Sequence, residues 1–90
     1  MSPSPEHQRH VEAFRAGSQE ALGVLYSAHG PRVRNYLWLL IGDPDMADDL
    51  THEVFMLAWR DRQQLREADG FVPWVMSIAR HHDFAGCPGG

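Results

Sequence analysis

Residues 48–60 have the pattern of a helix with two different sides, and this pattern limits the possible folds more than any other feature of the chain. Successive residues of an α-helix lie about 100° apart around its axis. On that spacing, one side of this segment and its flanks is aliphatic, through Ala47, Leu50, Val54, Ala58 and Leu65. The opposite side carries Asp45, Asp48, Asp49, His52 and Glu53. Only the aliphatic side can belong to a core, so the acidic side is expected to face outward.

Met56 and Trp59 project into the acidic side, where an isolated soluble helix has little reason to place large apolar groups. An acidic surface with apolar anchors indicates a docking face for a basic partner. A second interpretation is that acids near the start of a helix stabilise its dipole and need no partner. Trp59 could likewise cover the edge of a helical bundle. The residues alone leave both interpretations open.

Helix-ending residues divide the first half of the chain into two predicted helices. The first covers about residues 6–16, Gly17 ends it, and Ser18 is the expected N-cap of the second. Gly30-Pro31 interrupts the second helix, so we expect a kink or a short break there. Gly42 ends it in the manner typical of a C-terminal glycine. The apolar residues at helical spacing in the second helix are Leu22, Leu25, Tyr26, Val33, Tyr36, Leu37, Leu40 and Ile41.

Two more helices are predicted in the second half. Asp43-Pro44 has the pattern of an N-cap followed by proline in the first turn, and this third helix is expected to run to about Leu65. Residues 66–70 are polar and end in glycine, which predicts a loop. A last helix follows, with Pro73 tolerated in its first turn. Its apolar residues are Phe71, Trp74, Val75, Ile78 and Ala79.

The chain is therefore expected to fold as an all-α protein, a compact bundle of three to four helices. Strand patterns are nearly absent, and ninety residues suffice for one small domain. We expect residues 1–5 to be flexible, residues 6–83 to form the domain, and residues 84–90 to be a disordered tail.

Composition excludes several classes of protein. A net charge of −4 opposes tight autonomous binding to nucleic acid, because such binding depends on neutralising phosphates. No apolar run approaches the roughly 20 residues of a membrane span, and the N-terminus lacks a secretory pattern. A single cysteine, Cys87, rules out an internal disulfide framework. The expected location is the cytoplasm, with no membrane partner.

A set of residues in a fixed order resembles the extracytoplasmic-function (ECF) sigma factors of bacteria. The set is Gly42-Asp43-Pro44, Ala47-Asp48-Asp49-Leu50-Thr51, Glu53-Val54-Phe55, Ala58-Trp59-Arg60, Phe71, Trp74 and Ile78-Ala79-Arg80. The resemblance covers about residues 14–82 and is to the first conserved domain of these transcription-initiation proteins. In the family, that domain binds core RNA polymerase and the −10 element of the promoter.

The resemblance implies that the third helix packs on the clamp helices of the polymerase β′ subunit. By matching position, the expected polymerase contacts are Asp48, Asp49, His52, Glu53 and Trp59, with Met56 as a further apolar anchor. The family usually has glutamine where His52 stands. An imidazole at this position would make the contact sensitive to pH near its usual pKa of about 6.5.

The resemblance also implies that residues 61–70 and the last helix melt the −10 element and hold its non-template strand. Single-stranded DNA is held by basic groups on phosphates and by aromatic or arginine planes against bases. The expected DNA contacts are Arg60, Arg62, Arg66, Arg80 and His81. Trp74 and Ile78, at core spacing, are assigned to the core instead.

The resemblance weakens after Arg80, and the family's second domain, a helix-turn-helix, is absent. The chain is expected to be either a fragment or a short protein that kept the polymerase-binding half. One alternative function is therefore a truncated sigma-like module that binds polymerase or an anti-sigma factor without reading DNA.

A second alternative is a small metal- or ligand-binding helical bundle. Ligand types for zinc occur at His81, His82, Asp83 and Cys87, and His7 and His10 are three residues apart. None of these has the spacing of a zinc motif. Neither a catalytic triad nor a glycine-rich phosphate loop is present, so no metal, cofactor or enzymatic activity is expected.

Overall fold

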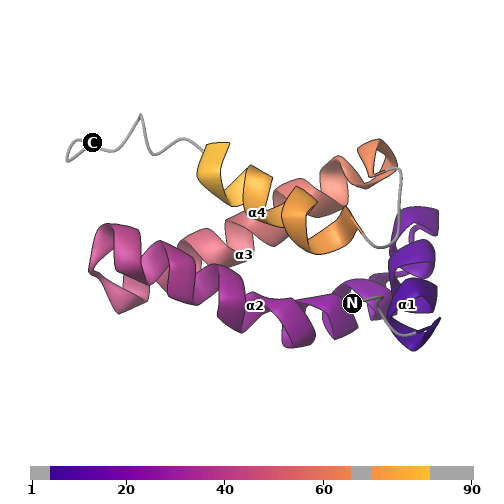
Figure 1. Cartoon of the computed structure of the whole chain (residues 1–90), viewed down its shortest axis with the longest axis horizontal. Helices are drawn as coiled ribbons and strands as arrows, with labels where there is room; N and C mark the ends of the chain where they lie inside the picture. Colours follow the sequence, from indigo (N-terminus) through magenta and orange to yellow (C-terminus); the bar gives the residue numbers. More distant parts are fainter. Residues whose placement is uncertain (1–4, 66–69, 82–90) are drawn as a thin grey trace.

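The computed structural model describes residues 5–65 and 70–81, and helices account for nearly all of them. The elements are α1 (Pro5–Ala16), α2 (Gln19–Ile41), α3 (Pro44–Arg60), the 3-10 turn η1 (Arg62–Gln64) and α4 (Phe71–His81). α2 and α3 form an antiparallel pair, α4 lies over that pair, and α1 crosses α2 near its start (Figure 1). The predicted all-α bundle is confirmed, and no described helix is long and apolar enough to span a membrane.

The turn between α1 and α2 forms where the sequence predicts it. Gly17 adopts a φ of 106°, in the left-handed region that favours glycine, and its N–H donates to the carbonyl oxygen of Phe14 at 3.0 Å. The Ser18 hydroxyl then accepts the backbone N–H of Ala21 at 3.1 Å. Both predictions, the glycine stop and the serine N-cap, are confirmed, although α1 begins one residue earlier than expected, at Pro5.

The turn between α2 and α3 consists of Gly42 and Asp43 alone. Gly42 has a φ of 81°, and its N–H donates to the carbonyl oxygen of Trp38 at 2.7 Å. The Asp43 carboxylate accepts the N–H groups of Asp45 and Met46 at 3.0 and 3.3 Å. The predicted C-terminal glycine and N-cap are therefore confirmed, and together they reverse the chain within two residues.

Of the kink or short break predicted at Gly30-Pro31, the break is wrong, because α2 continues through Pro31 without interruption. Proline removes one helical hydrogen bond, which here is the bond to the carbonyl group of Ser27. Pro31 and Ser27 are both exposed, so water can satisfy that carbonyl. Gly30 is buried beside the ring of Tyr26.

α3 ends at Arg60 and not near Leu65 as predicted. The Arg62 guanidinium donates to the carbonyl oxygen of Trp59 at 3.0 Å, and so takes an acceptor that a continuing helix would use. The chain tightens into η1, where the N–H of Gln64 donates to the carbonyl oxygen of Asp61 at 2.8 Å. Leu65 still reaches the core, as its place in the aliphatic pattern predicts.

The core is built around three fully buried phenylalanines, Phe14, Phe55 and Phe71. The rings of Phe14 and Phe71 meet edge to face, with centroids 5.7 Å apart. The buried residues of α3 are Ala47, Thr51, Val54, Phe55 and Ala58. Leu50, predicted for this stripe, is only partly buried, whereas Phe55 and Thr51 were not assigned to it. The Thr51 hydroxyl is compatible with burial because it donates to the carbonyl oxygen of Ala47 at 2.7 Å.

α4 contributes to the same core through every fourth residue, Phe71, Val75 and Ala79. Trp74 and Ile78, which the sequence assigned to the core, pack against it but keep part of their surface exposed. That assignment is therefore only partly right.

The Asp43 N-cap offers a direct test of the α2–α3 turn. Replacing Asp43 with alanine removes the acceptor for two backbone N–H groups and should lower the free energy of unfolding by about 1 kcal/mol. Asp43→Asn should cost much less, because the amide oxygen caps a helix about as well. Urea unfolding followed by circular dichroism measures both variants. An equal loss for both would mean that the carboxylate acts through its charge and not as a cap.

Candidate functional site

The outward side of α3 is an exposed acidic surface. We call it the acidic face and define it as Asp45, Asp48, Asp49, His52, Glu53 and Met56, all of which are exposed. Because the inward side of α3 packs on α2 and α4, the bundle leaves this face open to solvent. Met56 keeps 41% of its surface exposed among these acids. Five of the six residues expected to contact a polymerase therefore lie together on one surface.

Trp59, the sixth, is placed differently. Its ring packs edge-on against Phe14, with centroids 5.7 Å apart, and is partly buried. The Arg62 guanidinium lies over the same ring at 4.4 Å from its centroid, a cation–π contact. Trp59 thus covers the edge of the bundle, which is the alternative that the sequence left open. Met56 is the better placed of the two apolar side chains for contact with a partner.

Asp48 already has a partner within the chain. It forms an ion pair with Arg34 of α2, and both side chains are substantially exposed, at 58% and 39%. The Arg34 guanidinium also lies 5.7 Å from the ring centroid of Trp38. Exposed ion pairs contribute about 0–1 kcal/mol to stability, so Asp48 can exchange this partner for another at little cost.

A shallow groove beside Met56 adds residues of α2 to the surface. It is lined by Gln19, Leu22, Gly23, Tyr26, His52 and Met56. The ring of Tyr26 lies 6.2 Å from that of His52 and 4.8 Å from that of Phe55, so it connects the groove to the core. Sequence reasoning did not identify Leu22 and Tyr26 as surface residues, because it treated them only as apolar residues at helical spacing in the second helix. No signal in the sequence indicated that they stay partly exposed.

The residues expected to contact DNA are not gathered at one place. Arg60 forms a two-point contact with Asp61, with Nε–Oδ1 and Nη2–Oδ2 distances of 3.0 Å. This hydrogen bonding lowers the pKa of Asp61 and raises that of Arg60. The Arg62 guanidinium donates a hydrogen bond to the carbonyl oxygen of Trp59. Arg66 lies outside the described residues.

Arg80 and His81 are both exposed and lie in the last turn of α4. His81 places its Nδ1 2.8 Å from the carbonyl oxygen of Ser77. Arg60 lies in the last turn of α3 and Arg80 in the last turn of α4, so the two arginines lie on different helices.

The described residues contain no group of three or more His, Cys, Asp or Glu side chains arranged to hold a metal ion. His7 and His10 do not form a pair. Instead, Nε2 of His7 lies 2.9 Å from Nε2 of His29 on α2. His82, Asp83 and Cys87, the other residues considered as ligands, lie outside the described part of the chain.

Comparison with known proteins identifies a family for this chain. The model of the Sigma-70 region 2 family matches residues 25–82. RNA polymerase sigma factor CarQ of Myxococcus xanthus is 35% identical over 69 residues, which are 77% of this chain and 40% of CarQ. ECF RNA polymerase sigma factor BldN of Streptomyces coelicolor is 33% identical over 72 residues, which are 79% of this chain and 27% of BldN.

The chain thus spans less than half the length of these curated relatives. No solved structure gives a significant match. The family match begins within α2 and includes α3, η1 and α4, which together carry the acidic face and the exposed end of α4. The match covers more than half of the chain, and the chain therefore belongs to the Sigma-70 region 2 family as a domain of the ECF sigma factor type.

Proposed function

We propose that this domain binds core RNA polymerase through the acidic face of α3, with the β′ clamp helices as the partner. The observation that carries the proposal is the exposure of five acidic or imidazole side chains and Met56 on one side of a helix whose other side is buried. Family membership supports the same partner.

The chemistry of the acidic face fits a basic partner with an apolar centre. Complementary charges accelerate the encounter between two proteins and fix the register of their complex. Apolar side chains that become fully desolvated supply most of the binding free energy. Met56 lies beside the groove formed with Leu22 and Tyr26, so an apolar side chain of the partner could contact all three. The Asp48–Arg34 pair would open on binding, because both groups are exposed.

We further propose that residues 61–70 and α4 contact the non-template strand of the promoter −10 element. Arg80 and His81 are the exposed basic residues that support this part of the proposal. Arg62 is a weaker candidate, because contact with a phosphate would remove it from the ring of Trp59. With a net charge of −4, the chain needs polymerase to hold it against DNA. This function would place the protein in the cytoplasm.

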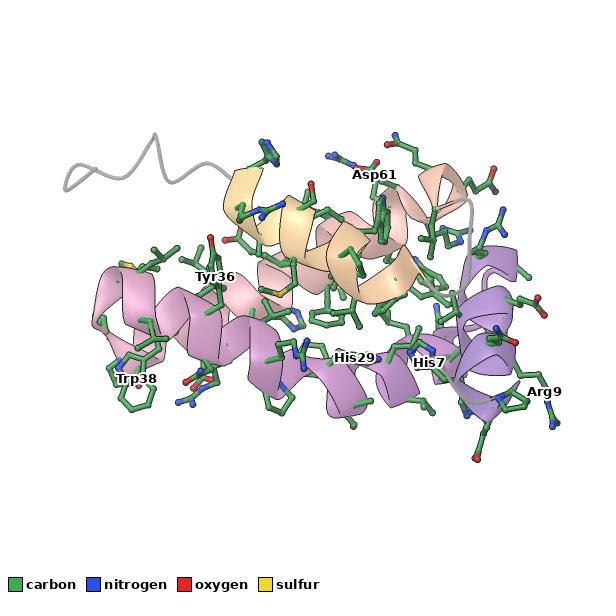
Figure 2. The ribbon with its side chains drawn as sticks, viewed as in Figure 1. His7, Arg9, His29, Tyr36, Trp38 and Asp61 are labelled. Atoms are coloured by element: carbon green, nitrogen blue, oxygen red, sulfur yellow. The ribbon has the colours of Figure 1, made fainter. Side chains whose placement is uncertain are left out.

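A second candidate function is a protein-interaction module that binds polymerase or an anti-sigma factor without reading DNA. It is favoured by the apolar surface at the α2–α3 turn, where Trp38, Leu39, Leu40 and Met46 are exposed, Leu39 to 78%. Trp38 lies on the outer side of α2, away from the bundle (Figure 2). Large exposed apolar residues near one turn favour contact with other proteins.

Charge reversal tests the polymerase contact. Asp49→Arg places a positive charge in the acidic face and should weaken binding to core polymerase by at least about tenfold, or 1.4 kcal/mol. Glu12→Arg makes the same change in charge on α1 and should leave binding unchanged. Titration of the labelled chain with core polymerase measures both. Equal weakening by the two variants would show that net charge, and not this face, controls binding.

Truncation separates the two apolar side chains. Met56→Ala should weaken polymerase binding while leaving the free energy of unfolding nearly unchanged, because Met56 is exposed. Trp59→Ala should destabilise the chain by about 3 kcal/mol, because its ring packs on Phe14. Urea unfolding and polymerase titration should be measured on both variants. A stable Trp59→Ala chain that fails to bind would restore Trp59 as the anchor.

Salt dependence tests the DNA contact. The affinity of the complex with core polymerase for a single-stranded −10 oligonucleotide is measured as a function of salt concentration. Arg80→Ala should reduce the magnitude of the slope of log affinity against log salt by about 0.7, the value for one phosphate contact. Arg9→Ala, on the outer side of α1 (Figure 2), is the matched control. An unchanged slope with Arg80→Ala would favour the interaction-only function.

A further inference from the structure

Two histidines from different helices meet at the α1 end of the bundle. Nε2 of His7 on α1 and Nε2 of His29 on α2 are 2.9 Å apart, a hydrogen-bond distance. Their rings are nearly perpendicular, with centroids 5.0 Å apart, and both side chains are partly buried (Figure 2). A contact of this geometry needs one nitrogen with a hydrogen and one without, since an N–H can only donate to a lone pair.

The pair also holds the first residue of α4. The ring of Phe71 lies 5.4 Å from that of His29 and 6.4 Å from that of His7, measured between centroids. Phe71 is fully buried and packs on Phe14 as well. The two histidines therefore connect α1, α2 and the start of α4 at one point.

The surroundings of His29 oppose a positive charge on its ring. Burial lowers the pKa of His29, and the nearby His7 and Arg32 lower it further. α4 faces this ring with the uncharged side chain of Phe71. When His7 carries the positive charge that lowers the pKa of His29, both of its ring nitrogens have a hydrogen and can only donate, so neutral His29 is then the acceptor of the pair. With His7 as the charged donor, a proton added to Nε2 of His29 would bring two N–H groups face to face and remove the hydrogen bond.

We propose that the His7–His29 pair is a pH-sensitive clasp, which holds α1 and the start of α4 against α2 while His29 is neutral and releases them when His29 gains a proton. Phe71 begins α4, which we propose to contact DNA, so release would loosen the start of that helix. That consequence depends on the proposed function. The clasp itself does not.

The direction of the pH effect follows from linkage. The unfolded chain takes up a proton on His29 near the usual value of about 6.5, whereas the folded chain resists it to lower pH. The stability due to the clasp is therefore complete above that pH and is lost as the pH falls below it. The loss stops once folded His29 is also protonated. Over this range the folding equilibrium constant should fall by up to about tenfold per pH unit.

Urea unfolding of the 90-residue chain from pH 8 to pH 5, with a chelator present, tests the clasp. His29→Gln keeps an oxygen that can accept from His7 but does not titrate, so it should remove the part of the acid destabilisation that is due to His29. His10→Gln, on the same helix as His7 but outside the pair, should keep the wild-type pH dependence. The proposal is overturned if His29→Gln and the wild-type chain lose stability in parallel.

Hydrogen exchange of the wild-type chain gives a second readout that needs no variant. Lowering the pH from 7.5 to 5.5 should reduce the protection factors of α1 amides by at least about threefold more than those of α3 amides. Parallel loss in the two helices would contradict the clasp. Neither experiment involves polymerase, and the Asp49→Arg titration does not involve His29. Failure of the clasp and failure of the proposed function are therefore separate results.

Discussion

The packing of the inward side of α3 determines what the rest of the molecule can present. Ala47, Thr51, Val54, Phe55 and Ala58 occupy the space between α2 and α4 and fix how α3 is rotated about its axis. A rotation by one residue position, about 100°, would turn charged and polar positions of the acidic face inward. Burying an unpaired carboxylate costs several kcal/mol. The acidic face is therefore held outward by the core beneath it, with no need for contacts of its own.

The sequence predicts those parts of the fold that depend on contacts between residues close together in the chain. Ser18, Gly42 and Asp43 end or begin helices through hydrogen bonds to groups within four residues, so their roles are visible in the chain itself. The end of α3 was missed although the Arg62 guanidinium and the carbonyl group of Trp59 are only three residues apart, because arginine occurs both within helices and at their ends. A continuing helix would also have placed Leu65 in the core, so periodicity could not separate the two outcomes.

The candidate site shows the same division. The helical pattern alone predicts that the acidic side chains of α3 face outward, because the opposite side of the helix is aliphatic and must be buried. Trp59 does not, because its packing partner Phe14 is 45 positions away in the chain and its cover, Arg62, was expected to bind DNA. A sequence shows that an arginine is charged but not which group within the fold already holds it. For the same reason, the His7–His29 contact across α1 and α2 was not foreseen.

The two-residue connection between α2 and α3 has a consequence for how the chain acquires its shape. Gly42 and Asp43 close a hairpin whose two helices are adjacent in sequence, so little conformational entropy is lost in joining them. Contacts of short sequence separation form fastest. By contrast, Phe14 and Phe71 must meet across most of the chain. A nascent polypeptide should thus display its negatively charged helix before its last helix has packed, so that the surface proposed for protein recognition forms ahead of the one proposed for nucleic acid.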